Sequence, residues 1–399
     1  MYIHRIPFLR LISASVFVVM AAMFLTSCKE STATTDPSSP PSDDPVPVNT
    51  SIPKSPGAFL DPADNPSSAA KVELGRHLFY DKQMSVDGQT SCASCHDVAS
   101  GFSDSRGLKT SMGFNSQMGT RNAPALANVA YNTVFTWDGR FPSLEKHAPG
   151  PIFNSLEMGN NFSRTFSNDT VSSGYNSKPG NNDTNFLFKR LNGDPSIRKD
   201  MNNKTYDQLR IAAWPNSQKL TMDIIAKSIA AFERTFISTQ SDFDKYNNGD
   251  KQIFKYNPWA IQGFKLFTDP NGANCVSCHS GYNFTDQEFH NNGIGQSSDD
   301  KGHSAISKIP ADDYTFKTPS LRNVALSGPY MHNGSFASLD QVLRNYNQGG
   351  KPGTNHDQRI KPLNLSEQDM SNIIEFLRTL TDNNFVGDKS GKFSNPWQN

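Results

Sequence analysis

Two short stretches decide the fold: Cys92-Ala93-Ser94-Cys95-His96 and Cys275-Val276-Ser277-Cys278-His279. Each has the pattern C-x-x-C-H, in which two thiols attach one haem and the following histidine binds its iron. A redox dithiol or half of a zinc site could account for one copy, but not for two copies that use four of the five cysteines. The sequence therefore predicts two covalently bound haem c groups, with His96 and His279 as proximal iron ligands.

The sequence around the two motifs is also repeated. Gly75–Asp81, before the first motif, resembles Gly263–Asp269, before the second. Beyond the motifs, residues recur at one constant offset: Pro124 with Pro319, Leu126 with Leu321, Asn128 with Asn323, Val129 with Val324, Ala130 with Ala325, Gly139 with Gly334, Phe141 with Phe336, Ser143 with Ser338 and Leu144 with Leu339. The repeat predicts a mainly α fold of two tandem cytochrome-c-like domains related by internal duplication.

Each copy ends in an amphipathic helix, which Thr221 caps in the first copy and Ser366 in the second. We expect the first haem domain over 57–245, the second over 246–385, and a tail over 386–399. The Asn- and Ser-rich stretch Asn160–Asp183 is expected to be a loop insertion in the first domain. The second copy is longer than the first between its haem motif and Pro319, and the polar stretch Gly293–Asp313 is the best candidate for this insertion.

The N-terminus predicts export. Residues 1–28 combine basic residues with the apolar run Leu11–Leu25 and end in Leu25-Thr26-Ser27-Cys28, which resembles a bacterial lipoprotein signal with Cys28 as the lipidated residue. A membrane helix with an incidental cysteine is the alternative. Residues 29–56 are dominated by Ser, Thr, Pro and Asp, a composition typical of a flexible tether. We therefore expect a protein of the periplasmic side or cell envelope, held to a membrane by lipid.

The charge balance narrows the class of partner. The chain has 38 basic and 38 acidic side chains, so its formal net charge at pH 7 is zero. Proteins that bind nucleic acid usually carry a basic excess or a basic stripe. Composition therefore gives no support to a nucleic-acid partner.

Several ordered motifs resemble the bacterial di-haem cytochrome c peroxidases, over roughly residues 57–385. They are Thr110–Phe114, Arg121–Pro124, Phe135–Arg140, Gly150-Pro151, Leu156–Met158, Lys317–Asn323 and Gly328–His332. The resemblance implies that the first haem is the peroxidatic one and that Glu157 is its distal acid/base. It also implies that Trp137 lies between the haems. Asn122, with the backbones of Ser327 and Pro329, matches the family's calcium site between the domains.

The chain departs from the family pattern at three positions. Phe114 stands where many of these peroxidases have a distal histidine, so the first haem is expected to be open without prior reduction. His147 replaces the distal glutamine; it could be a second acid/base, bind the iron, or be a surface residue. Tyr346 aligns with the axial methionine of the second haem and resembles the His/Tyr ligation of MauG-type enzymes, while Met331 is a competing ligand. A phenolate ligand stabilises ferric iron and would give a low-potential haem.

The resemblance implies reduction of hydrogen peroxide, with electrons from a small cytochrome c or cupredoxin that docks at the second domain. Two alternatives remain at this stage. A MauG-type enzyme would use peroxide to oxidise Trp or Tyr side chains of a partner protein, and an electron-transfer cytochrome would have no peroxide chemistry. Many relatives are dimers, so a homodimer is also considered.

Overall fold

The computed structural model describes residues 52–59, 61–160, 187, 190, 191, 200, 202–255, 257–297 and 299–397. The expected signal with Cys28, the expected tether up to residue 51, and the expected loop insertion beyond Asn160 lie outside these ranges. None of the helices within them has both the length and the apolar character that a membrane span requires.

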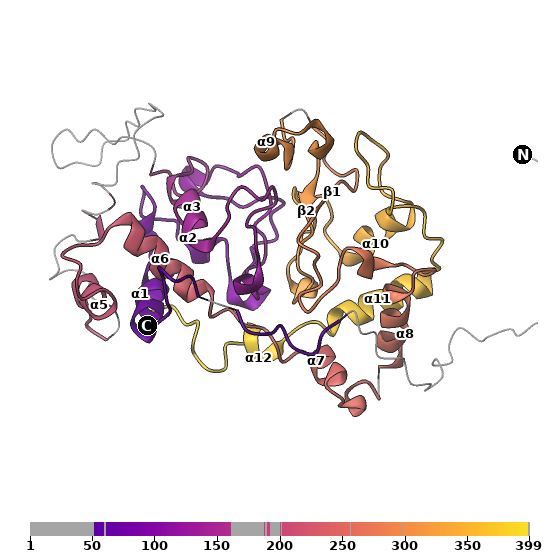
Figure 1. Cartoon of the computed structure of the whole chain (residues 1–399), viewed down its shortest axis with the longest axis horizontal. Coiled ribbons are helices and arrows are strands. Elements are labelled where there is room, and N and C mark those ends of the chain that lie inside the picture. The colour runs from indigo at the N-terminus through magenta and orange to yellow at the C-terminus, as the bar shows by residue number, and fades with distance from the viewer. Residues whose placement is uncertain are drawn as a thin grey trace, which may run out of the picture. The chain divides into compact units, whose positions relative to one another are not determined.

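The described chain consists of short helices joined by long irregular loops, with one small antiparallel pair of strands (Figure 1). In the first half the helices are α1 (Ala69–Tyr80), α2 (Leu144–His147), α3 (Pro149–Phe153), α5 (Tyr206–Ala213) and α6 (Met222–Glu233). In the second half they are α7 (Asp242–Asn247), α8 (Pro258–Thr268), α9 (Ser304–Ser307), α10 (Leu339–Asn347), α11 (Glu367–Arg378) and α12 (Asn383–Val386). The strands β1 (Phe289–His290) and β2 (Phe316–Lys317) pair through Phe289 and Lys317. The predicted mainly α class is confirmed.

Each half is built on one pair of crossed helices, α1 with α6 and α8 with α11. The crossing depends on a glycine that recurs in both copies. A Cβ atom on Gly75 would lie 1.9 Å from the carbonyl oxygen of Ser228, and one on Gly263 would lie 1.9 Å from that of Asn372. Only a residue without a side chain allows two helix backbones to approach so closely. The same contact in both halves is a structural sign of the duplication.

The backbone between the helices repeats as well. Asn128 and Asn323 both have a φ of 59°, in the left-handed region that asparagine tolerates better than most residues. Thr136 and Met331 have φ values of 71° and 73°. The structure therefore confirms the pairing of positions that the sequence repeat predicts.

Phenylalanine dominates two separate cores. In the first, Phe102 stacks on Phe236 with ring centroids 3.7 Å apart, and Phe385 and Phe393 from the end of the chain pack against them. In the second, Phe243, Phe264, Phe267, Phe284 and Phe376 pack together, with Ile52 from the beginning of the described chain. Full burial of one such side chain is worth roughly 1.5–3 kcal/mol. Both ends of the described chain are thus anchored in a core.

The predicted caps are present on α6 and α11. The Thr221 hydroxyl accepts a hydrogen bond from the backbone N–H of Ile224. Ser366 and Asp369 form a reciprocal capping box at the start of α11. These caps fix where α6 and α11 begin, and the last turn of α6 reaches the cavity described next.

Candidate functional site

Both C-x-x-C-H motifs form a short 3₁₀ turn that brings the histidine back over the cysteines. The backbone N–H of His96 donates to the Cys92 carbonyl at 3.0 Å, and that of His279 to the Cys275 carbonyl at 2.8 Å. The Nδ1–H of His96 donates to the Phe102 carbonyl at 2.8 Å. In the second half, the Nδ1–H of His279 likewise donates to a backbone carbonyl, that of Phe284, at 2.9 Å. A histidine held this way keeps its Nε2 lone pair free for a metal.

The first motif lines a cavity with an empty volume of about 550 Å³. Its wall includes Cys92, Cys95 and His96 from the motif, and Glu157 and His147 from elsewhere in the first half. Burial raises the pKa of both cysteines, which keeps them as neutral thiols. Two thiols and a free imidazole nitrogen that line one cavity fit a covalently attached haem.

Glu157 follows the short helix α3 and is open to this cavity. Its Oε1 accepts a hydrogen bond of 2.5 Å from the Asn154 amide. Surrounding protein atoms raise the pKa of the carboxyl by desolvation, while Asn154 and Arg140 oppose the rise. A carboxyl with a raised pKa, open to the cavity that the first haem motif lines, is suited to moving protons.

His147 ends α2 and lies on the same wall, between the rings of Phe135 and Phe141. Its Nδ1 is buried and has no hydrogen-bond partner among the described residues. Desolvation, with smaller contributions from the charges of His96 and Arg140, lowers the pKa of His147 to about 4. The imidazole is therefore neutral at neutral pH, and its unpaired Nδ1 is buried in a residue that lines the cavity.

Phe114 is buried behind Glu157 and does not line this cavity. Its backbone N–H donates to the Glu157 carbonyl at 2.6 Å. The preceding Gly113 makes this approach possible, because a Cβ there would lie 2.3 Å from the Leu156 carbonyl oxygen. The segment that bears a distal histidine in many family members here supports the Glu157 loop instead.

Trp137 is hydrogen-bonded to both halves of the molecule. Its indole N–H donates to the Asn122 carbonyl at 2.8 Å, and its own carbonyl accepts from the Lys317 backbone N–H at 2.8 Å. Its ring lies 6.4 Å from the ring of His332, measured between centroids. Trp137, which is expected to lie between the haems, is thus found where strand β2 of the second half meets the first half.

Asn122 lies beside Pro329, as the expected calcium site requires. The Asn122 amide contacts the Pro329 carbonyl oxygen, and its backbone N–H donates to the His332 carbonyl at 2.7 Å. Ser327 lies two positions before Pro329, with its hydroxyl bonded to the Val324 carbonyl at 3.2 Å. Turned over, the Asn122 amide would present its oxygen beside that of Pro329, and oxygen pairs of this kind suit calcium.

The two candidate ligands of the second haem lie on either side of one amide. Asn292 Nδ2 is 3.2 Å from the hydroxyl oxygen of Tyr346 and 3.4 Å from the sulfur of Met331. Desolvation raises the pKa of Tyr346, and the Asn292 hydrogen bond opposes the rise. Cys275 and Cys278 also act on the phenol electrostatically. Tyr346 on α10 therefore faces the second haem motif.

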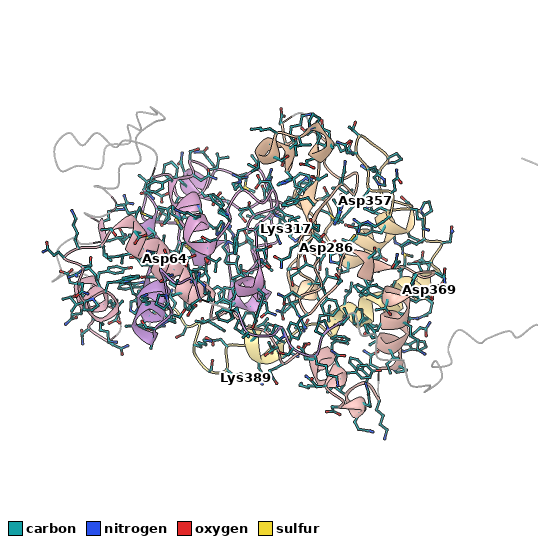
Figure 2. The ribbon with its side chains drawn as sticks, in the orientation of Figure 1. Asp64, Asp286, Lys317, Asp357, Asp369 and Lys389 are labelled. Atoms are coloured by element: carbon teal, nitrogen blue, oxygen red, sulfur yellow. The ribbon has the colours of Figure 1, made fainter. Side chains whose placement is uncertain are left out.

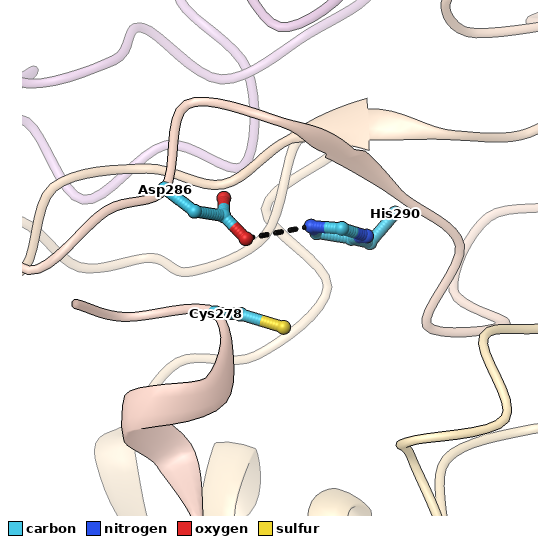
Figure 3. A group of neighbouring side chains, drawn as sticks. All are labelled: Cys278, Asp286 and His290. Atoms are coloured by element: carbon cyan, nitrogen blue, oxygen red, sulfur yellow. Dashed lines mark hydrogen bonds and ion pairs between the residues drawn. The ribbon is translucent and has the colours of Figure 1, made fainter.

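Cys278, Asp286 and His290 bring three donor atoms close enough to hold a metal ion (Figure 3). Cys278, however, belongs to the second haem motif, and thioether formation would consume its thiol. The remaining groups form an ion-pair network in which His290 contacts Asp286 at 2.9 Å and Asp357 at 3.0 Å. We therefore assign this cluster to the edge of the second haem site.

Lys317 lies close to this network (Figure 2). Burial lowers the pKa of Lys317 to about 8, and the carboxylate of Asp286 opposes the shift. The lysine comes from strand β2, whose backbone also bonds to Trp137. A buried cation therefore lies between Trp137 and the second haem motif.

The cavity also contains Glu233, which was not predicted as a site residue. It is the last residue of α6 and only 4% exposed, and it lines the cavity with Glu157 and His147. The sequence repeat could have revealed Glu233, because the corresponding residue of the second copy is Leu377. A carboxyl in one copy and a leucine in the other marks a position at which the two halves have diverged.

Comparisons with known proteins agree with this geometry. Residues 69–252 match the family described as di-haem cytochrome c peroxidase, and residues 260–381 match cytochrome c. The methylamine utilization protein MauG of Methylorubrum extorquens is 34% identical over 320 residues, 80% of each chain. Cytochrome-c peroxidase IdrP1 of Denitromonas iodatirespirans is 32% identical over 352 residues, 80% of this chain and 84% of the relative.

Among solved structures, a MauG-like protein associated with microbial copper homeostasis superposes with a TM-score of 0.73. It is 29% identical, and the match covers 88% of this chain and 98% of that one. Two haem motifs on duplicated helical halves, a cavity that the first motif and Glu157 line together, and these matches lead to one conclusion: the chain belongs to the di-haem cytochrome c peroxidase family.

Proposed function

We propose that this protein reduces hydrogen peroxide to water at the first haem, with electrons from a small c-type cytochrome or copper protein. The observation that carries the proposal is that Glu157 and His147 line the same cavity as the proximal ligand His96. An electron-transfer cytochrome without peroxide chemistry would need neither a distal carboxyl nor space beside its iron.

When bound, the haem iron supplies the electron-transfer chemistry on peroxide. Glu157 takes a proton from one oxygen of hydrogen peroxide and returns it to the other, so that the second oxygen leaves as water. The raised pKa of Glu157 brings its proton affinity closer to neutral pH, which favours both transfers. His147, neutral because its pKa is lowered to about 4, orients peroxide through its free nitrogen and adds no positive charge.

Electrons enter at the second domain and pass between the haems by way of Trp137. The support for this route is the position of Trp137, whose backbone and indole bond to β2 and to the Asn122 segment. A calcium ion bound by Asn122, Ser327 and Pro329 would hold this junction together. We also propose that the protein acts in the cell envelope, with a lipid anchor on Cys28.

Tyr346 is proposed as the axial ligand of the second haem. Replacement of Tyr346 by Met should raise the reduction potential of that haem by roughly 0.1–0.3 V, since axial ligands span ~0.8 V and methionine favours ferrous iron. Potentiometric titration of the holoprotein measures the shift. Met331→Leu is the matched control and should leave the potential unchanged; a lost second-haem spectrum in that variant would make Met331 the ligand.

The proposed function is tested with the di-haem holoprotein, peroxide and a reduced small cytochrome c. The as-isolated ferric protein should show one high-spin haem and react at once with peroxide, because Phe114 offers no distal imidazole. Two donor electrons should then be consumed per peroxide. Two low-spin haems and no reaction before half-reduction would mean that His147 or another group occupies the first iron.

A MauG-type reaction is the second candidate, favoured by Tyr346 and by the match to MauG. In that case peroxide would be consumed while a small cytochrome c remained reduced. The oxidising equivalents would then appear on Trp or Tyr side chains of a partner protein. The same stoichiometric assay therefore separates the two candidates.

A further inference from the structure

Peroxide reduction needs more protons than Glu157 can supply alone. One peroxide, two electrons and two protons give two waters, whereas Glu157 moves only a proton that peroxide already carries. The two additional protons must therefore reach the cavity from elsewhere in each turnover. A buried group that holds a proton at neutral pH would meet part of this need.

Glu233 is the buried carboxyl that fits this need. Its side chain is almost inaccessible to solvent, and its Oε2 has no hydrogen-bond partner in the part of the chain that the structure describes. An unpaired carboxylate in such a position would be costly, whereas a protonated carboxyl is tolerated. Both Glu233 and Glu157 act electrostatically on Cys92, which places the two carboxyls around the same haem attachment point.

The duplication gives an internal comparison. The terminal helices share the segments Phe232–Phe236 and Phe376–Leu380, so Glu233 corresponds to Leu377. Leu377 is 5% exposed and belongs to the second core, and Glu233 is equally buried. In the second copy, whose haem is proposed only to transfer electrons, an apolar side chain therefore occupies this helix position. The carboxyl occurs in the copy whose haem cavity holds Glu157.

Charged residues surround the inner end of α6, where Glu233 lies. Glu145 Oε1 accepts hydrogen bonds from the Asn65 amide, at 2.8 Å, and from Arg234. Arg234 Nε lies 3.9 Å from Asp61, whose side chain is 28% exposed. These contacts place charged and polar side chains beside the inner end of α6. The titratable and charged groups around Glu233 are Arg234 on α6, Glu145 and His147 on α2, and Cys92 and Glu157, which line the same cavity.

We propose that Glu233 is a second proton-carrying residue of the first haem site, which delivers a proton to Glu157 for the second water, formed when the oxygen that remains is reduced. The O–H bond of Glu233 breaks, its proton forms an O–H bond on the Glu157 carboxylate, and Glu233 is reprotonated from solvent. The two electrons come from the reduced donor protein. This inference rests on the proposed peroxidase function.

The pKa of Glu233 gives the expected pH dependence. Burial raises this pKa to about 8, with Arg234 opposing the rise and the negative charge of Glu145 adding to it. Below pH 8 Glu233 carries its proton and can donate it. Above pH 8 the proton is lost, so turnover should fall as the pH rises through this value.

The test uses the holoprotein variants Glu233→Gln and Glu233→Leu, the latter copying the second domain. Both should retain two haems, lower kcat by about 10²-fold and lose the alkaline limb of the pH profile. Glu375→Gln, a partly exposed glutamate on α11, is the matched control and should keep the wild-type profile. Variants that keep the alkaline limb near pH 8 would overturn the proposal, whatever their kcat.

A second measurement does not depend on turnover. The absorption spectrum of the ferric first haem should change between pH 7 and 9 in the wild type and not in Glu233→Gln, while the spectrum of the second haem stays constant. No transition in the wild type would refute a titrating Glu233. If the wild type showed this transition but did not reduce peroxide, the proposed peroxidase function would be wrong, while Glu233 would still be a buried group that titrates beside the first haem.

Discussion

Replacement of Glu157 by Gln should lower kcat for peroxide reduction by about 10²–10⁴-fold, the range that general acid–base catalysis contributes. Glutamine keeps the size of the side chain and can still contact Asn154, so the cavity should retain its haem. What is lost is the group that takes and returns a proton. The rate of donor oxidation under saturating peroxide measures the effect, with the haem content of each preparation determined in parallel.

The pH profile separates this chemical role from a structural one. Glu157 must be ionised to accept the first proton, and its pKa is raised above the ordinary value of 4.5. The wild type should therefore lose kcat/KM as the pH falls through that raised pKa, and Glu157→Gln should not. A control is Glu73→Gln on α1, which pairs with Arg76 away from the cavity. Undiminished activity of the Glu157 variant would remove the carboxyl from the mechanism.

The two carboxyls of the cavity together predict a bell-shaped profile. Glu157 acts first as a base and sets the acid limb, while Glu233 acts as an acid and sets the alkaline limb. Glu145 influences the alkaline limb, because its negative charge raises the pKa of Glu233. Neutralisation of Glu145 should therefore shift the alkaline limb to lower pH without abolishing it.

The sequence predicted the duplicated fold because the repeat is strong at the positions that the backbone needs most. The backbone requires a glycine in α1 and in α8, and it favours asparagine at the left-handed positions Asn128 and Asn323. Such residues recur wherever the same backbone recurs. The haem motifs were equally readable, because covalent attachment demands a fixed spacing.

The cavity was only partly predictable. Glu157 and His147 were found through a family resemblance, whereas Glu233 lies far beyond Glu157 in the sequence and on another helix. Its role depends on the packing of α6 against α2, which hydrophobic periodicity cannot specify. The ends of the chain show the same limit: Phe393 lies far from Phe102 in sequence, yet both pack in one core.

A buried ion pair in the second half should be the most sensitive point of the fold. The Arg322 side chain is fully buried, and its Nη1 donates to Asp244 Oδ1 at 2.7 Å. Its Nε and Nη2 donate to the Tyr282 carbonyl at 2.9 and 2.7 Å. Asp244 Oδ2 also accepts from the Ser241 backbone N–H at 3.0 Å, which completes the capping box of α7. Every charge in this cluster is compensated inside the protein.

Loss of either partner should therefore lower the free energy of unfolding of the second half by about 3–5 kcal/mol, because the other charge stays buried and unpaired. Asp244→Asn and Arg322→Met are the two variants, and hydrogen exchange of the α8 and α11 amides measures the loss. The α1 and α6 amides serve as an internal control and should keep their wild-type protection. The double variant should be destabilised by much less than the two single effects combined, since it leaves no unpaired charge. Additive losses would mean that Arg322 and Asp244 act separately, through Tyr282 and the α7 cap.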